Sequence, residues 1–508
     1  RHDFQLGLSE DCAPQVPNEF IPVFEQSKVK NSKITGQPIT NETEEIFITE
    51  ISKESWEEYV SAKKKNTAAG KSGIRVDHVA AAPERLKEAT RKLLSLPYLS
   101  GITYDAWQNE IITWLPKEEN NPDIAKRRPI TLLEVLKKMH IGVKKNEFIN
   151  IAIKHGMISE DHHGALAGKS TVVPLMKKIL ALEDARHYKR PIVTSDVDLK
   201  RAYDMVPTFI KEMALRRIGM PEEGITLWSA NDSTKQVMTT TAFGFTNPIT
   251  PVAGAFGQGA EDSPFGFVAF MSWLTDYLDT LTHEPYVFAN DTEGENPVAQ
   301  SYFVDDSTFM QKTISGMQQV ITGICKFCFA TGMEINFGKS FYTTINVEQE
   351  IPIKMWKWVP APHESSWMHG TSILTPMAKK ENKEYWKYLG HLTNNEGCSK
   401  EALKKLLVKV DEQVEHLMGK RMSKNGAIEV INTLIHSVVT YALQFASFSK
   451  NAIRQIDASI MRLVKSKLKI ARSTDDSIVK GSVLGAGLGI QTAWDKINIA
   501  KLKILSAG

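Results

Sequence analysis

The residues of this sequence that could do chemistry together are aspartates. Asp305 and Asp306 are adjacent, and Asp198 lies at the end of a separate apolar run. Adjacent carboxylates repel each other, and a divalent cation such as Mg²⁺, which takes oxygen ligands, would remove the repulsion. Two such ions about 4 Å apart can stabilise the attacking and leaving oxygens of a phosphoryl transfer. The aspartates therefore indicate metal-assisted phosphoryl transfer if they converge, whereas an isolated Asp-Asp pair would indicate a surface turn.

Two strand-like segments would have to bring these acids together. Residues 301–310 read SYFVDDSTFM, in which β-prone runs flank the acids, so the pattern predicts a hairpin with Asp305 and Asp306 at its tip. Residues 192–199 are also strand-like, and Asp196 and Asp198 would share one face because side chains alternate along a strand. Asp198 is the better candidate, since a reactive carboxylate needs to lie at the strand end.

A second predicted hairpin supplies basic side chains. Residues 111–117 and 126–133 are strand-like, and a polar turn separates them. This pairing would bring Lys117 and Arg128 near each other. Basic side chains on such a flap could clamp a triphosphate.

Composition excludes several classes of protein. The chain has 508 residues, 42% hydrophobic and 24% charged, which is typical of a soluble protein with two to four packed units. Four cysteines are too few and too scattered for a disulfide framework. No apolar run reaches about 18 residues, so we expect no membrane span and no membrane partner. The first residue is Arg and no secretory or other targeting signal is visible, so we expect a fragment or a processed product.

The two ends of the chain differ from its middle. Prolines and polar residues over 1–45 predict an irregular, extended arm, and residues 44–65 have the apolar spacing of one helix. Residues 400–472 are helical in pattern and hold 14 Lys and Arg against 6 Asp and Glu, a net charge of +8, although the whole chain carries only +3. Such helices present either a solvated face or a surface that neutralises nucleic-acid phosphates.

Residues 162–170 contain two ambiguous patterns. The segment GALAGKS resembles a phosphate-binding loop, but its glycines are separated by three residues instead of four, and no convincing strand precedes it. His162 and His163 could be metal ligands, but adjacent His side chains usually point apart. We expect a polar loop near the substrate here.

With these features in place, the chain from about residue 44 to 500 resembles the reverse transcriptases of LINE-type non-LTR retrotransposons. The matching segments are GKSGI at 70–74, RPITLL at 128–133, HGALAGKST at 163–171, DLKRAYD at 198–204, GQG at 257–259 with SP at 263–264, FVDD at 303–306, GMEINFGK at 332–339, YLG at 388–390, and GLG at 487–489 with Asn498 and Ala500. Three positions depart from the family pattern. Lys71 stands in place of Pro, Ala165 in place of Phe and Gly257 in place of Arg, and these departures concern template contacts more than chemistry.

The resemblance implies a role for each matching residue. Asp198 and Asp305 would ligate two Mg²⁺ ions, for which Mn²⁺ can substitute, with Leu199 beside them and Asp306 as the partner acid. Lys339 is the implied acid that protonates pyrophosphate. The implied residues that bind the dNTP are Lys117, Arg128, Leu199, Tyr203, Gln258 and Gly259, where the Tyr203 ring would exclude a 2′-OH. Tyr388, Leu389 and Gly390 would hold the primer end.

The resemblance also implies an α+β right-hand polymerase. Its expected parts are an N-terminal extension (1–45), fingers (46–190), a palm with the primer grip (191–398) and a helical thumb (399–508). The expected partners are an RNA template, a DNA primer and dNTPs, and possible assembly with the element's own RNA; the expected location is intracellular and, from the family, the nucleus. Two alternatives stay open, namely a group II intron-type or RNA-copying polymerase and a domesticated nucleic-acid-binding protein. Tyr203 argues against rNTP use, and the intact aspartates argue against loss of activity.

Overall fold

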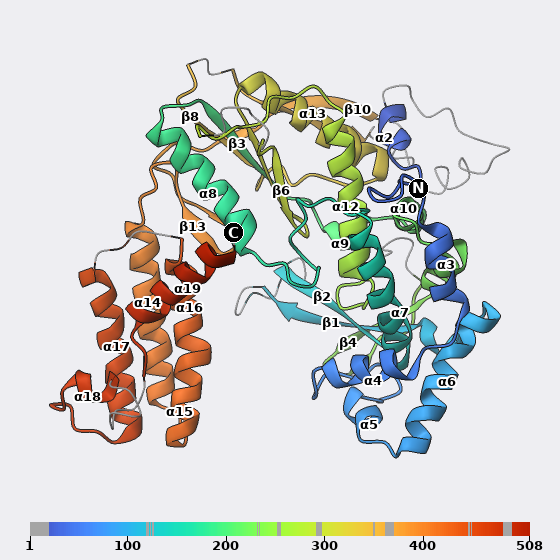
Figure 1. Ribbon diagram of the computed structural model, residues 1–508, viewed down its shortest axis with the longest axis horizontal. Helices are drawn as coiled ribbons and strands as arrows, with labels where there is room; N and C mark the ends of the chain where they lie inside the picture. Colours follow the sequence, from blue (N-terminus) through green and yellow to red (C-terminus); the bar gives the residue numbers. More distant parts are fainter. Residues whose placement is uncertain are drawn as a thin grey trace.

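The computed structural model is a mixed α+β protein (Figure 1). It describes residues 20–117, 121, 123, 126–230, 232, 234–250, 256–290, 297–348, 351–360, 370–445, 448, 450–480 and 490–507. A central sheet lies between two groups of helices, one N-terminal and one C-terminal (Figure 1). The division into fingers, palm and thumb stays a prediction, as do the boundaries given for it.

The central sheet has five strands in the order β11-β8-β3-β7-β6. Strand β3 (Ile192–Val197) lies in the middle and runs antiparallel to both β7 (Asp306–Gln311) and β8 (Phe341–Ile345). β6 (Gln300–Phe303) pairs antiparallel with β7, and β11 (Ala378–Lys379) pairs parallel with β8. Nearly every residue of β3 is buried, as expected for a central strand with both faces covered.

Different elements cover the two faces of this sheet. Val193 and Val197 of β3 pack with α2 (Ile21–Glu25), α10 (Thr208–Arg217), α12 (Ser263–Asp279) and α13 (Ile314–Thr331). Ile192 packs on the opposite face with α8 (Val172–His187) and with the hairpin of β12 (Trp386–Tyr388) and β13 (His391–Thr393). Alternation along β3 therefore assigns Asp196 and Asp198 to the face covered by α8.

A second sheet has four strands in the order β2-β1-β4-β5. β1 (Asn109–Pro116) pairs antiparallel with β2 (Arg127–Leu133), which confirms the predicted hairpin, and parallel with β4 (Gln236–Thr241). β5 (Gly244–Phe245) closes the sheet. A separate large core is formed by the helices α3 (Thr40–Ile48), α4 (Lys53–Ala62), α5 (Val76–Ala80), α6 (Glu84–Ser100), α7 (Val135–Lys154) and α11 (Glu222–Ser229). Trp107, just before β1, and Val135, just after β2, belong to it.

Short elements connect these units. A 3₁₀ turn (Asp105–Gln108) precedes β1, and α9 (Ala202–Met205) follows β3. β9 (Lys354–Pro360) and β10 (Gly370–Pro376) form an antiparallel pair of their own, of which β9 packs on α13.

The described part of residues 399–508 is helical. The helices are α14 (Lys400–Met418), α15 (Lys424–Val430), a π-helical turn (Ile431–Ile435), α16 (His436–Leu443), α17 (Lys450–Leu468), α18 (Asp476–Lys480) and α19 (Ala493–Ala507), and they share one apolar cluster. By length and composition alone, one stretch of the described chain, Lys424–Leu443, is apolar enough to cross a membrane. A core helix of a protein that does not cross a membrane passes the same test. Ile431, Ile435 and Val439 of this stretch are buried in the apolar cluster.

Two expectations for the N-terminal part were wrong. Residues 20–45 are not an extended arm, because Val23 of α2 is fully buried in the core of the central sheet. Residues 44–65 form two helices instead of one, since α4 starts afresh where Ser52 accepts a hydrogen bond from the backbone of Ser55. Residues 1–19 lie outside the described part.

The packing of α7 on α4 generates a stability prediction. At Gly142 in α7, a Cβ atom would lie 2.1 Å from the hydroxyl oxygen of Tyr59, which donates to the Lys138 carbonyl at 3.2 Å. Gly142→Ala should therefore cost about 1–3 kcal/mol of folding free energy through overpacking. Thermal unfolding checks this, with Gly419→Ala as the control, because its Cβ would be no closer than 3.7 Å to other atoms. A Gly142→Ala protein that melts with the wild type would contradict the packing.

Candidate active site

The predicted Asp-Asp hairpin exists, but its tip is displaced by one residue. Phe303 of β6 pairs with Asp306 of β7, so the two-residue turn is Val304–Asp305, and Asp306 already belongs to the strand. Val304 adopts a φ of 61°, which is uncommon for a β-branched residue. Only Asp305 of the two acids therefore lies at the tip itself. Val304, which was expected to belong to the strand, lies in the turn.

Residues 161–164, which precede α8, contact β6 and this turn. Tyr302 donates its backbone N–H to the Asp161 carbonyl and accepts from the His163 N–H, both at 2.9 Å. A Cβ on Gly164 would lie 2.5 Å from Val304 Cγ2, so the close approach requires glycine. This segment is not the expected polar loop, because His162 and His163 are buried. Burial lowers the pKa of His162 to about 3 and that of His163 to about 4, so both rings are neutral.

Asp198 lies beside these acids because of strand register. The last ladder pair of β3 and β7 joins Val197 to Ser307, and the Ser307 hydroxyl donates to the Val197 carbonyl at 3.0 Å. One step further along each strand come Asp198 and Asp306, on the face covered by α8. The structure thus brings together acids that lie more than a hundred residues apart in the sequence.

The segment that precedes β8 holds the Asp198 carboxylate. The Asn336 side-chain amide donates to Asp198 Oδ2 at 2.7 Å, and Lys339 Nζ lies 3.8 Å from the same oxygen. The Asp198 backbone N–H donates to the Ser340 hydroxyl at 3.1 Å. Leu199 is buried and forms a bridge with Ile335, so only its backbone could serve a ligand. Lys339 reaches the site from a largely exposed position.

The acids repel one another. Burial, together with the charges of Asp305, Asp198 and Asp196, raises the pKa of Asp306 to about 6. Burial and the charge of Asp198 also raise the pKa of Asp305, although its own backbone N–H, Lys339 and Arg128 oppose the shift. Asp306 is packed on one side only and keeps an exposed part, where solvent screens some of this repulsion.

These residues fit a hard divalent cation in kind, because carboxylate oxygens are the ligands that Mg²⁺ prefers and a cation would relieve the repulsion. Their positions are not closed around one point. Within the described ranges, no group of three or more His, Cys, Asp or Glu side chains is close enough to hold a metal ion.

The β1–β2 flap brings basic side chains to the acids. Arg128 in β2 is exposed, and its charge acts on Asp305. Lys117 follows β1, donates its backbone N–H to the Lys126 carbonyl at 3.0 Å, and its charge acts on Asp204 in α9. The two cations therefore lie at the same end of the flap, where Arg128 acts on Asp305 and Lys117 acts on Asp204.

Tyr203 and the Gln258–Gly259 loop border the same region. The Tyr203 ring in α9 stacks on Phe267 of α12 with ring centroids 4.7 Å apart. Burial and the charge of Asp305 raise the pKa of Tyr203. The backbone carbonyl of Gln258 accepts a hydrogen bond from the Thr131 N–H at 2.7 Å. Gly259 has a φ of 112°, and a Cβ atom there would lie 2.7 Å from the Thr131 carbonyl oxygen. The contacts with Thr131 thus hold the loop against β2, three residues along the strand from Arg128.

Leu389 and Gly390 form the tight turn of a hairpin whose first strand ends at Tyr388. Tyr388 pairs with His391, and Leu389 and Gly390 between them have φ values of 46° and 84°. Burial raises the pKa of Tyr388, and the charges of Asp196 and Asp306 add to the shift, so the turn lies near the acids. The GLG segment at 487–489 lies outside the described residues.

Two further neighbours of the acids do not stand out from the sequence pattern. Asn336 lies inside the GMEINFGK motif, and Lys178 lies outside every motif. Lys178 of α8 is buried and ion-paired with Asp196. The signal was present, because a Lys on an apolar helix and an Asp inside an apolar strand each need a partner when buried.

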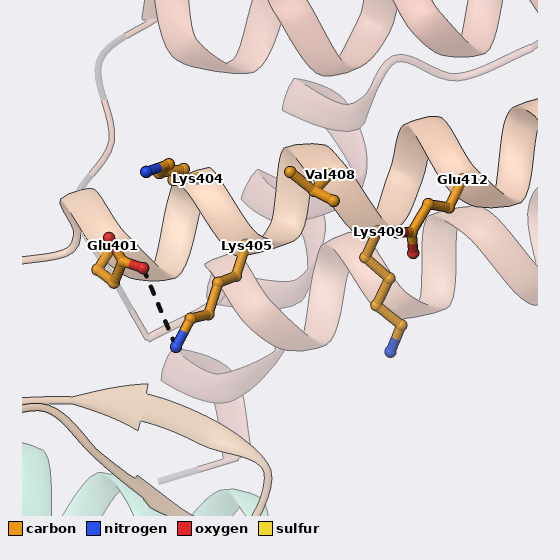
Figure 2. A pocket seen from close by; sticks show the side chains of 6 residues that line it. All are labelled: Glu401, Lys404, Lys405, Val408, Lys409 and Glu412. Carbon is orange, nitrogen blue, oxygen red and sulfur yellow. Dashed lines mark ion pairs between the residues drawn. The ribbon is translucent and has the colours of Figure 1, made fainter. Parts of the chain in front are cut away.

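The basic C-terminal helices also present a hollow on the outside of α14 (Figure 2). The residues that line this hollow are Glu401, Lys404, Lys405, Val408, Lys409 and Glu412. Lys405 Nζ lies 4.0 Å from the Glu401 carboxylate, so acidic side chains neutralise part of the positive charge of the hollow.

The acid cluster generates a prediction about metal-free protein. At pH 7.5, Asp306→Asn should raise the melting temperature, because it removes one of three like charges. An acid with a raised pKa weakens the fold where it is ionised, so the gain should shrink as the pH falls through about 6 towards 4. Mg²⁺ should raise the melting temperature of the wild type more than that of the variant.

Calorimetry at several pH values measures this, with Glu160→Gln as the control. Glu160 is an exposed acid outside the cluster. A variant that melts at or below the wild-type temperature in metal-free buffer at pH 7.5 would show that the repulsion is absent.

No protein-family model and no curated protein matches the sequence. Among solved structures, the chain is similar to an apo telomerase from Candida tropicalis truncated from its C-terminal domain, with 13% sequence identity and a TM-score of 0.38. The similar region covers 58% of this chain and 54% of the telomerase chain.

Proposed function

We propose that this chain is an RNA-directed DNA polymerase, which extends a primer 3′-OH with dNTPs on an RNA template. The convergence of Asp198, at the end of β3, with Asp305 and Asp306, at the β6–β7 turn, carries the proposal. Repelling carboxylates on adjacent strand ends suit two-metal phosphoryl transfer better than fold stability. The order of the sequence motifs around these acids supports the same conclusion.

The proposed reaction forms a bond from the primer 3′-oxygen to the α-phosphorus of the dNTP, while the bond from that phosphorus to the bridging oxygen breaks and pyrophosphate leaves. Asp198, Asp305, Asp306 and the Leu199 backbone would hold Mg²⁺, or Mn²⁺ in its place. Bound metal would activate the 3′-OH and neutralise charge on the leaving group.

The chain's own cations would complete the site. Arg128 and Lys117 on the flap would bind the triphosphate, because they lie at the same end of the flap and Arg128 acts on Asp305. Lys339 lies next to Asp198 and would give a proton to the departing pyrophosphate. The Tyr388–Gly390 turn would support the primer end.

The finer assignment rests on the motif resemblance. We propose a non-LTR retroelement enzyme of the LINE type with fingers, palm and thumb in the order of the chain. Its template would be the element's own RNA in a ribonucleoprotein, and its site of action the nucleus.

Asp305→Asn tests the metal role. It should lower primer extension on an RNA template with dNTPs and Mg²⁺ by about 10³-fold or more, with the affinity for primer–template within twofold. Glu160→Gln is the matched control. Equal extension by Asp305→Asn would reject the metal assignment, and no extension by intact wild type would reject the polymerase in favour of a nucleic-acid-binding protein.

Tyr203 tests sugar selection. Tyr203→Ala should raise incorporation of rNTPs relative to dNTPs by about 10-fold or more, because removing the ring opens space for a 2′-OH. Tyr203→Phe keeps the ring on Phe267 and should retain the wild-type ratio. Single-nucleotide incorporation measures both, and an unchanged ratio in Tyr203→Ala would remove the gate role.

A further inference from the structure

Lys178 occupies an unusual position for a cation. Its side chain is 1% exposed in the middle of α8, and its ammonium group is ion-paired with Asp196. Asp196 lies two residues before Asp198 on the same face of β3. The buried cation is therefore next to the strand end that carries the candidate carboxylates.

The same ammonium group faces the β12–β13 hairpin. Lys178 Nζ lies 4.6 Å from the centre of the Tyr388 ring and 5.8 Å from that of Trp386. A cation is attracted to the face of an aromatic ring, more strongly where water is excluded. One side chain thus connects β3 to the residue that begins the Leu389–Gly390 turn.

Tyr441 of α16 contacts this turn as well. Its hydroxyl donates to the Leu389 carbonyl and lies 3.2 Å from Thr171 Oγ1, at the N-terminus of α8. A Cβ on Gly390 would lie 3.4 Å from the Tyr441 ring. Leu389 at a φ of 46° is in a conformation that persists only with such support.

Stability alone does not account for this arrangement. Asp196 Oδ2 and the Tyr388 hydroxyl are both buried without a hydrogen-bond partner. A buried ion pair with unsatisfied neighbours adds little net stability compared with apolar residues of similar volume. What the pair does provide is a fixed distance between β3 and the turn.

We propose that Lys178 and Tyr441 are positioning residues that clamp the Leu389–Gly390 turn against the carboxylate end of β3, and so set where a primer 3′ end rests relative to Asp305. This inference rests on the proposed polymerase function. It assigns a role to two residues that lie outside all of the sequence motifs.

The test removes the clamp while keeping the interior neutral. Lys178→Met with Asp196→Asn replaces the ion pair by uncharged side chains of similar size, and Tyr441→Phe removes the hydrogen bonds of the other arm. The control is Lys53→Met with Glu57→Gln, which removes an ion pair at 3.7 Å within α4, away from the site. Primer extension gives kcat and the KM for dNTP, binding gives the affinity for primer–template, and thermal melts report the folded fraction.

We expect kcat to fall by about 10- to 100-fold in the Lys178–Asp196 variant and in Tyr441→Phe, with KM for dNTP and primer–template affinity within twofold, because a misplaced 3′ end slows only the chemical step. The control should keep the wild-type kcat. Folded variants that extend at the wild-type rate would overturn the inference and leave the polymerase intact. If the double variant does not fold, Tyr441→Phe decides alone, and a wild type that never extends a primer would overturn both proposals.

Discussion

The repulsion among Asp198, Asp305 and Asp306 is the interaction on which the rest of this structure depends. Burial and this repulsion together raise the pKa of Asp306 to about 6, and strands free to separate would relieve the repulsion. They cannot separate, because β3 is bonded to β7 on one side and β8 on the other, and both of its faces are buried. The cores on either side of the sheet thus hold the charges together, so that the free energy of packing offsets a local electrostatic cost.

Polar groups around the cluster give neighbouring acids different tasks. Asp196 points into the interior, where Lys178 neutralises it. Asp198, two residues on, is held by the neutral amide of Asn336 at 2.7 Å and only loosely by Lys339 at 3.8 Å. A tight ion pair would make Asp198 a poor ligand for any other cation, whereas a single amide hydrogen bond orients the carboxylate and leaves its charge available. The difference between an acid whose charge is neutralised and one whose charge stays available is thus one of partner, not of residue type.

Local pattern was enough to predict the strands that carry the candidate acids and the β1–β2 hairpin, but not the contacts around the acids. The β1–β2 hairpin and the strand β3 follow from residue pattern and turn residues, which act over a few positions. The position of the β6–β7 turn does not, because Val304 takes a left-handed conformation that its residue type disfavours and Gly164, far away in sequence, makes room for it. The burial of His162 and the pairing of Lys178 with Asp196 depend in the same way on tertiary packing. Residues 20–45 were misjudged for that reason too, since prolines mark a break in regular structure but not exposure.

The same long-range contacts tie the C-terminal helices to the site. Val439 and Leu443 of α16 are buried in the helical cluster, while Tyr441, on the same helix, packs with α8 and the β12–β13 hairpin. α16 therefore belongs to two cores at once. Its Tyr441 hydroxyl contacts both Leu389 and Thr171, so a shift of α16 relative to α8 would have to break one of these contacts or carry the turn with it. Because Lys178 opposes movement of the turn away from β3, the position of the C-terminal helices and the position of the turn are mechanically coupled.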